Sequence, residues 1–346
     1  MELKSEFKLR LNRVRSRLNE LGLDFFLVST PKNVYYLTGK DTGSVLIGDG
    51  GATLWVRDIY YELYSRFYEM NLPFRVRKAG RDELVKHVRS LDCKEVGIED
   101  MSVLRSRRLS RKFKRKLMAV DIMRECRAVK TDYEIRCIRK SSQIAVEGMA
   151  DAARRIRRGV SEREAAASVE YKMRLLGSES APFDEGMILA YGKNAADIHI
   201  RPTGRKIGDG LVVVDLGAKW RNYYSDMTRT VKVGRCTRMQ LRLLEFVSNL
   251  EDEAIDYLEP GLTGGEAHEF VQTRIEREGY RFHHASGHGI GLDVHEAPDM
   301  GPESSETLKE GMVLTIEPGI YLPGRMGVRF EDTVLLKKDN AVRLTA

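Results

Sequence analysis

The sequence contains few cysteines and no long apolar segment. Its 346 residues include four cysteines, which show neither the C-x-x-C spacing of thiolate zinc sites nor a dense disulfide framework. No run of about 18 apolar residues is present, and the amino terminus MELKSEFKLRLNRVRSRL is charged where a signal peptide would be apolar. We therefore expect free thiols, a cytoplasmic location, and neither membrane insertion nor secretion.

The net charge is +7, and much of the positive charge lies in one segment. Residues 105–116 are predicted to form a basic helix. Its basic residues are Arg105, Arg107, Arg108, Arg111, Lys112, Lys114, Arg115 and Lys116. The apolar residues that are predicted to face a core are Leu104, Leu109, Phe113 and Leu117. No aromatic ladder accompanies the charges, so we do not expect nucleic acid as a partner; a nucleic-acid-binding or scaffold protein stays an alternative.

The length of the chain suits two domains, and 32% charged with 42% hydrophobic residues is typical of a globular protein. In residues 1–122 helical and strand patterns alternate, which predicts an α/β domain with a mixed sheet. A turn is expected at Pro31-Lys32-Asn33, and Gly48-Asp49-Gly50-Gly51 is a strong hairpin signal.

The pattern changes near residue 128, where we expect a second domain to begin and to extend to residue 346. Capping boxes indicate where its helices begin. These pair Thr131 with Glu134, Ser161 with Glu164, Thr237 with Gln240, and Thr263 with Glu266. Strands are expected at residues 187–190, 211–215, 228–233, 313–316 and 328–336. This predicts an α+β domain with helices packed on a curved, largely antiparallel sheet.

Five residues of this second domain form a candidate set of metal ligands. They are Asp215, Asp226, His288, Glu317 and Glu331. Four carboxylates and one imidazole suit Mn²⁺, Co²⁺, Fe²⁺ or Zn²⁺ and argue against a thiolate-held zinc. A single acid at a strand end is more often a turn or cap residue. Five acids and imidazoles next to apolar strands favour a metal site, because burying an unpaired carboxylate costs several kcal/mol.

These motifs, VVVDLG, SDMTRT, SGHGIG, TIEPGIY and GVRFEDT, resemble those of the pita-bread metallopeptidases. This family includes Xaa-Pro aminopeptidases, Xaa-Pro dipeptidases (prolidases) and methionine aminopeptidases. The segment Pro31–Gly39 resembles the signature of the amino-terminal creatinase-like domain, which favours the proline-specific branches. The resemblance implies a catalytic pita-bread domain over residues 128–346 and a homodimer.

The resemblance also implies a role for each ligand in a site for two divalent cations, with Mn²⁺ or Co²⁺ preferred. Asp215 would hold one cation, His288 and Glu317 would hold the other, and Asp226 and Glu331 would bridge the pair. Glu317 would also take the proton of the attacking water and pass it to the departing proline nitrogen.

Two further histidines match family positions that contact the substrate, and Arg329 is a candidate because of its spacing to Glu331. His199 and His295 would bind the substrate and stabilise the developing oxyanion. Arg329 lies two residues before Glu331, so one strand would turn both side chains to the same face. There Arg329 could orient a ligand carboxylate, relay protons or bind the substrate. An ordinary surface or core role stays open for each of these three residues.

The expected activity is hydrolysis of the X-Pro bond in peptides that carry proline at the second position. Where some relatives place a basic residue to capture a dipeptide carboxylate, this sequence has Asp299. That difference favours an Xaa-Pro aminopeptidase over the alternative, an Xaa-Pro dipeptidase. Arg201 and Arg205 could bind a carboxylate instead, although a solvated surface position is favoured for both.

Overall fold

The computed structural model describes residues 2–48, 50–69, 73–80, 82–99 and 101–346. The chain divides into two compact units, Met1–Arg127 and Ala128–Ala346. Residues 123–127, which separate the two predicted domains, lie in helix α6 (Ile122–Ala128). No helix within the described ranges is long and apolar enough to cross a membrane. All four cysteines are free thiols, as the spacing predicted.

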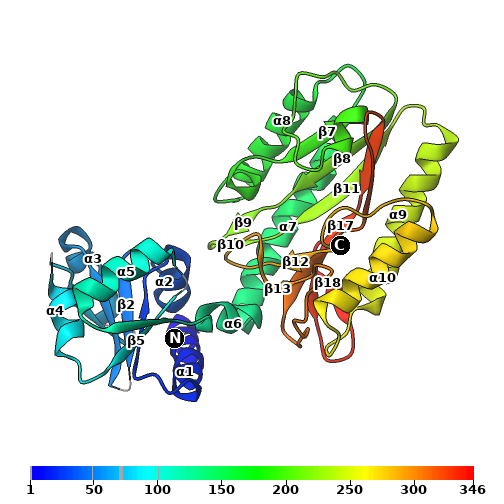
Figure 1. The fold of residues 1–346 in the computed structure, drawn as a ribbon. Helices are drawn as coiled ribbons and strands as arrows, with labels where there is room; N and C mark the ends of the chain where they lie inside the picture. The colour runs from blue at the N-terminus through cyan, green and yellow to red at the C-terminus, as the bar shows by residue number, and fades with distance from the viewer. Residues whose placement is uncertain (1, 49, 70–72, 81, 100) are drawn as a thin grey trace. The chain divides into compact units, whose positions relative to one another are not determined.

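The first unit is an α/β domain with a mixed sheet, which confirms the predicted fold class (Figure 1). Its six strands follow the order β4-β3-β2-β1-β5-β6, with antiparallel pairs β1–β2 and β2–β3 and parallel pairs elsewhere. The strands are β1 (Phe25–Val28), β2 (Ser44–Gly48), β3 (Gly51–Val56), β4 (Phe74–Lys78), β5 (Glu95–Ile98) and β6 (Lys116–Ala119). The helices are α1 (Glu2–Glu20), α2 (Pro31–Thr38), α3 (Asp58–Glu69), α4 (Glu83–Ser90) and α5 (Val103–Phe113).

The predicted turn at residues 31–33 is wrong, because these residues begin helix α2. Proline suits the first helical position, where its missing N–H is not needed. The free N–H groups before the helix are satisfied from far away in the sequence: Glu99 Oε2 accepts from the N–H of Thr30 at 2.7 Å. The predicted β2–β3 hairpin is present, with Gly48 paired to Gly51; Asp49 of its turn lies outside the described residues.

The predicted basic helix over residues 105–116 is shorter than expected. Helix α5 begins after the N-cap Ser102 and ends at Phe113, and Lys114 takes a left-handed conformation with φ of 54°. Leu104 is not a core residue, since it lies in the first turn and is 79% exposed. Leu117 belongs to β6, where it pairs with Val96 of β5. The apolar residues predicted to lie on one helix therefore belong partly to a helix and partly to a strand.

The second unit is built on a curved antiparallel sheet, as expected (Figure 1). Seven strands follow the order β13-β12-β14-β17-β11-β8-β7, and β18 pairs with β17. These strands are β7 (Ile188–Tyr191), β8 (Gly210–Leu216), β11 (Met227–Val233), β12 (His288–Gly289), β13 (Glu296–Asp299), β14 (Val313–Ile316), β17 (Glu331–Leu336) and β18 (Ala341–Arg343). Two short hairpins pair β9 (Lys219–Trp220) with β10 (Tyr223–Tyr224), and β15 (Gly319–Leu322) with β16 (Met326–Arg329).

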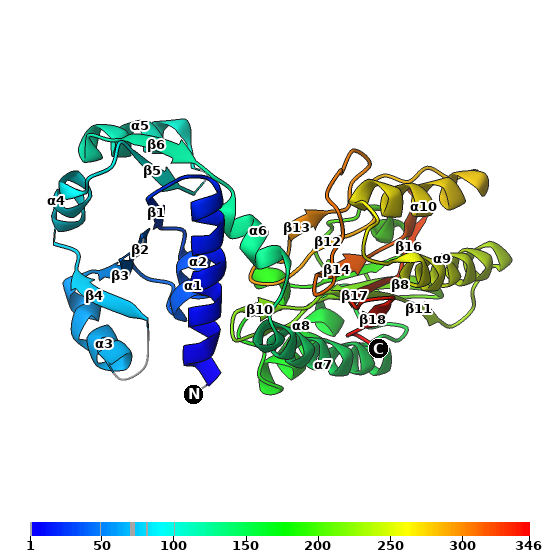
Figure 2. The ribbon, with the colours of Figure 1, turned by 90° about the horizontal axis from the view of Figure 1, so that it is seen from below.

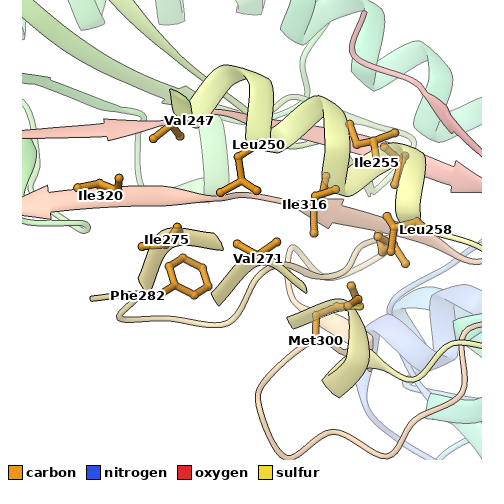
Figure 3. Packing of buried hydrophobic residues seen from close by; sticks show 14 of the residues in the cluster. Val247, Leu250, Ile255, Leu258, Val271, Ile275, Phe282, Met300, Ile316 and Ile320 are labelled. Atoms are coloured by element: carbon orange, nitrogen blue, oxygen red, sulfur yellow. The ribbon is translucent and has the colours of Figure 1, made fainter. Parts of the chain in front are cut away.

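Two pairs of helices cover this sheet. The helices are α7 (Asp132–Arg155), α8 (Glu162–Leu175), α9 (Arg238–Tyr257) and α10 (Gly264–Arg277). All four predicted capping boxes are present with reciprocal hydrogen bonds. The apolar cluster of α7 and α8 includes residues of β7, β8 and β11, whereas that of α9 and α10 includes residues of β14 and β17. Figure 2 shows the two pairs of helices as separate groups. In the second cluster Leu250 of α9 packs toward Ile316 and Val271 (Figure 3).

Candidate metal centre and active site

Asp215 and Asp226 lie at the same end of an antiparallel strand pair. Asp215 is near the end of β8, where its register partner is Thr228 of β11, and Asp226 immediately precedes β11. The chain between them can pass closely only because Gly217 has no side chain: a Cβ there would lie 2.0 Å from the backbone oxygen of Ser225. The hairpin expected from the spacing thus brings both carboxylates to one edge of the sheet.

Glu331 and Glu317 enter the same region from the neighbouring strands. Glu331 opens β17 opposite Thr228, whose hydroxyl donates to Glu331 Oε2 at 2.8 Å. Glu317 directly follows β14, and its backbone N–H donates to the Ser286 oxygen at 2.7 Å. Both carboxylates are therefore held at the ends of strands in the middle of the sheet.

His288 reaches the acids from β12, where the backbone is unusually crowded. A Cβ at Gly287 would lie 2.0 Å from the Thr315 oxygen, and one at Gly289 would lie 2.0 Å from the Ala297 oxygen. Burial lowers the pKa of His288 to about 3, which keeps the imidazole neutral. With Nδ1 donating to the Gly289 oxygen at 3.1 Å, Nε2 is the atom left to bind a cation.

The imidazole and the acids converge on one point. His288 Nε2 lies 3.8 Å from Asp226 Oδ2, 3.9 Å from Glu317 Oε1 and 4.0 Å from Glu331 Oε1. One ligand atom each from Asp226, His288 and Glu331 lies within 4.8 Å of the others. These residues and Asp215 line a single cavity of about 650 Å³. The structure therefore brings together all five residues of the predicted ligand set.

The electrostatics of this acidic cluster fit a divalent cation. Burial and the charge of Glu331 raise the pKa of Asp226 well above its usual range, and burial raises that of Glu317 to about 7. Burial also raises the pKa of Glu331, with the charge of Glu317 as the next cause. Asp215 Oδ1 and Asp226 Oδ1 are buried and accept no hydrogen bond from the described part of the chain. A cation bound between these oxygens would stabilise the ionised carboxylates.

Arg329 lies against the acidic cluster from the end of β16. Its guanidinium forms a buried ion pair with Asp215 and donates to the Thr228 hydroxyl at 3.2 Å. The prediction that one strand carries Arg329 and Glu331 is wrong, because Phe330 separates β16 from β17 and the two strands belong to different sheets. Both side chains nevertheless line the cavity.

His295 and His199 line the same cavity from two different segments. The His295 ring lies 4.1 Å from the His288 ring, centroid to centroid. Burial lowers the pKa of His295, with the neighbouring His199 as a second cause. His199 follows the short helix at Gly192–Ala196 and is exposed on the cavity side; its backbone N–H donates to Asp197 Oδ1 at 3.1 Å.

The structure adds two residues that the sequence analysis missed. His284 lines the cavity, with Nδ1 3.8 Å from Glu317 Oε2, and its Nε2 lies 2.9 Å from the Tyr321 hydroxyl. That hydroxyl also accepts from Arg329 Nη1 at 3.2 Å. Burial lowers the pKa of His284 to about 4. Both residues stand four positions from a candidate ligand, His284 before His288 and Tyr321 after Glu317, but neither segment is helical and this spacing alone does not predict a contact.

Charged side chains also line the cavity farther from the acidic cluster. Asp299 and Arg201 are both among its lining residues, whereas Arg205 lies over the ring of Tyr191, 5.3 Å from its centroid. Arg201 forms an ion pair with Glu185, which lines the cavity as well. Its guanidinium thus already has an acidic partner.

The chain is similar to known proteins over almost its entire length. Residues 10–129 match the creatinase/prolidase N-terminal domain, and residues 136–338 match metallopeptidase family M24. The Xaa-Pro dipeptidase of Pyrococcus horikoshii is 36% identical over 97% of this chain and 96% of its own length.

Solved structures agree in fold. The crystal structure of the prolidase from Pyrococcus horikoshii OT3 aligns with a TM-score of 0.89 at 35% identity, covering 97% of this chain and 98% of that chain. The X-Pro aminopeptidase from Thermotoga maritima MSB8 aligns with a TM-score of 0.86 at 31% identity, covering 97% of each chain. These findings confirm the resemblance and the two-domain fold. The chain is a metallopeptidase of family M24 with a creatinase-type amino-terminal domain.

Proposed function

We propose that this protein hydrolyses X-Pro peptide bonds with the help of two divalent cations. The observation that supports this proposal is a cavity in which four carboxylates and His288 converge, with buried oxygens of Asp215 and Asp226 left without hydrogen bonds by the described residues. Asp215 would hold one cation, His288 and Glu317 the other, and Asp226 and Glu331 would lie between them. Several relatives in the family are named for X-Pro substrates.

When bound, the cations supply Lewis-acid polarisation of the peptide carbonyl and a lowered pKa of the attacking water. Glu317 takes the proton of that water and delivers it to the departing proline nitrogen. His295 and His199 donate hydrogen bonds to the oxygen on which negative charge develops. Arg329 holds Asp215 in place through its ion pair and limits the repulsion within the acidic cluster.

Within this activity we favour an Xaa-Pro aminopeptidase that accepts peptides longer than two residues. A dipeptide places its free carboxylate inside the cavity, where Asp299 would repel it and Arg201 already pairs with Glu185. The second candidate is an Xaa-Pro dipeptidase. It is favoured by the name of the Pyrococcus horikoshii relative, at 36% identity.

Hydrolysis of short peptides by the metal-loaded protein tests the proposal and separates the two candidates. The protein is incubated with Mn²⁺ or Co²⁺ and with Gly-Pro, Arg-Pro-Pro, and the control peptides Gly-Ala and Arg-Ala-Ala. We expect release of arginine from Arg-Pro-Pro and little cleavage of the control peptides. Cleavage of Gly-Pro alone would identify a dipeptidase. Equal cleavage of proline and alanine peptides, or none with either metal, would refute the X-Pro assignment.

A further inference from the structure

The segment that carries His199 is tied to the sheet by one buried carboxylate. Glu162 is the first residue of α8 and has no exposed surface. Its Oε1 accepts from the backbone N–H of Tyr191 at 2.7 Å, and its Oε2 accepts from the backbone N–H of Thr203 at 2.9 Å. Tyr191 and Thr203 lie just outside the two ends of the segment 192–202. The carboxylate therefore closes this segment into a loop.

Side-chain hydrogen bonds strengthen this closure. Asn194 Nδ2 lies 2.9 Å from Glu162 Oε1 and 3.1 Å from Oε2, and the Thr203 hydroxyl donates to Oε2. Asn194 also donates to the Thr203 hydroxyl at 3.3 Å. The main chain of α8 adds a direct link, since the N–H of Arg163 donates to the Thr203 oxygen at 3.0 Å. Because all these donors must point at one buried carboxylate, Glu162 fixes the positions of Tyr191, Asn194 and Thr203.

Between these anchors the segment presents His199 to the cavity. Ala195 and Ile200 of the segment pack in a small apolar cluster with residues of β7 and β8. His199 and Asp197 are exposed, so little packing acts on the imidazole directly. The hydrogen bonds at the two ends therefore act together with this apolar contact to set the position of the loop. A displacement of about 1 Å in such a loop can reduce a reaction rate on the order of 100-fold.

We propose that Glu162 is a positioning residue which fixes the 192–202 loop so that His199 meets the substrate. This inference rests on the proposed function, because it gives His199 its substrate. Glu162 touches neither the substrate nor the candidate ligands. Its contribution acts through the loop.

The isosteric variant Glu162→Gln tests the chemistry of the anchor. A carboxylate offers only acceptors, whereas the amide has an NH₂ group in place of one oxygen. In one orientation this NH₂ group faces the N–H of Tyr191, and in the other it faces the N–H of Thr203. Either choice sets donor against donor at one end of the loop and should release that end.

A double-mutant cycle with His199→Ala distinguishes positioning from general destabilisation. We expect Glu162→Gln to lower kcat/KM for Arg-Pro-Pro by about tenfold or more when His199 is present. In the His199→Ala background, followed at high protein concentration, the same change should cost less than about twofold, because its target is gone. An equal loss in both backgrounds, or no loss when His199 is present, would overturn the proposal.

Glu164→Ala is the matched control, on the same first turn of α8. Glu164 accepts from the Ser161 N–H in the capping box and does not contact the 192–202 loop. This variant should lower the thermal midpoint and leave kcat/KM within about twofold of wild type, since its effect is a lost cap. Should Glu162→Gln fail to fold, Glu162→Asp, which keeps the acceptors but shortens the side chain, replaces it in the cycle.

Hydrogen–deuterium exchange provides a readout that does not depend on activity. Glu162→Gln should speed exchange of the backbone amides in residues 192–203, and Glu164→Ala should not. Unchanged exchange in Glu162→Gln would refute the positioning role even in a fully active enzyme. A wild-type protein that cleaves no X-Pro peptide would refute the proposed function instead, while the exchange result would still decide the role of Glu162.

Discussion

Replacing Lys130 by methionine should strongly destabilise the second unit. Lys130 Nζ lies 3.1 Å from Glu296 Oε1, and the two side chains are only 1% and 8% exposed. At this distance an effective dielectric constant near 20 gives an attraction of about 5 kcal/mol. Removing one partner of a buried pair usually costs about 3–5 kcal/mol, because the other charge stays buried without compensation. We therefore expect Lys130→Met to reduce the free energy of unfolding by this amount.

Most of this loss should come from the carboxylate of Glu296, which stays buried without the charge of Lys130. The double variant Lys130→Met/Glu296→Gln removes both charges and should recover more than half of the lost stability. Lys206→Met is the matched control: Lys206 pairs with Glu164 on the surface, with side chains 60% and 62% exposed. Its ion pair should contribute less than about 1 kcal/mol.

Urea unfolding followed by tryptophan fluorescence measures these differences for the second unit alone. The two tryptophans lie in different units, so Trp55→Phe leaves Trp220 as the reporter. Activity should fall together with stability, because Glu296 adjoins His295 and accepts from the Asp293 N–H at 3.2 Å. A loss below about 1 kcal/mol in Lys130→Met, or no recovery in the double variant, would show that the ion pair does not have the energy assigned to it.

Three further results are expected. Asp226→Ala should abolish hydrolysis and lower the metal content, measured by mass spectrometry of the metal, whereas Asp256→Ala on the exposed side of α9 should change neither; full activity with two bound cations would refute the bridging role. Burial and the charge of Asp332 raise the pKa of Glu251 from 4.5 to about 8. The folded state therefore keeps a proton that the unfolded state has lost, so the free energy of unfolding should fall as the pH rises from 4.5 to 8. Glu251→Gln should flatten this profile in urea titrations at several pH values, and an unchanged slope would contradict the assignment. Segment 105–116 should not retain the protein on immobilised DNA at moderate salt; retention that weakens steeply with added salt would support the nucleic-acid alternative.

Features that depend on residues close together in the sequence were predictable. Each capping box needs only a hydroxyl and an acid or amide three positions later, and all four are present. The hairpin that joins Asp215 to Asp226 follows from an apolar strand, a glycine and a second β-rich stretch. The position of these two acids at strand ends could therefore be predicted from the sequence.

Features that depend on distant partners were not predictable in the same way. The residues Pro31-Lys32-Asn33 predict a turn, but Thr30 is the N-cap residue of α2 and its side chain makes no cap hydrogen bond. The backbone N–H of Thr30 instead donates to Glu99, which is close in space but far along the chain. Leu104 and Leu117 share helical spacing with the core residue Phe113, yet the helix ends between them because Lys114 adopts a left-handed conformation. His284 was missed because its role depends on Glu317 and Tyr321, which only the fold brings near.

The close backbone contacts at Gly287 and Gly289 limit the substitutions that this protein can tolerate. A methyl group at either position would overlap a neighbouring strand, at 2.0 Å from a carbonyl oxygen. Even alanine would force β12 away from its neighbours and carry His288 with it. The capacity to hold a cation is thus as sensitive to two positions that supply no ligand as it is to the ligands themselves. Substitutions at Gly287 or Gly289 would therefore inactivate the enzyme without changing any charged residue.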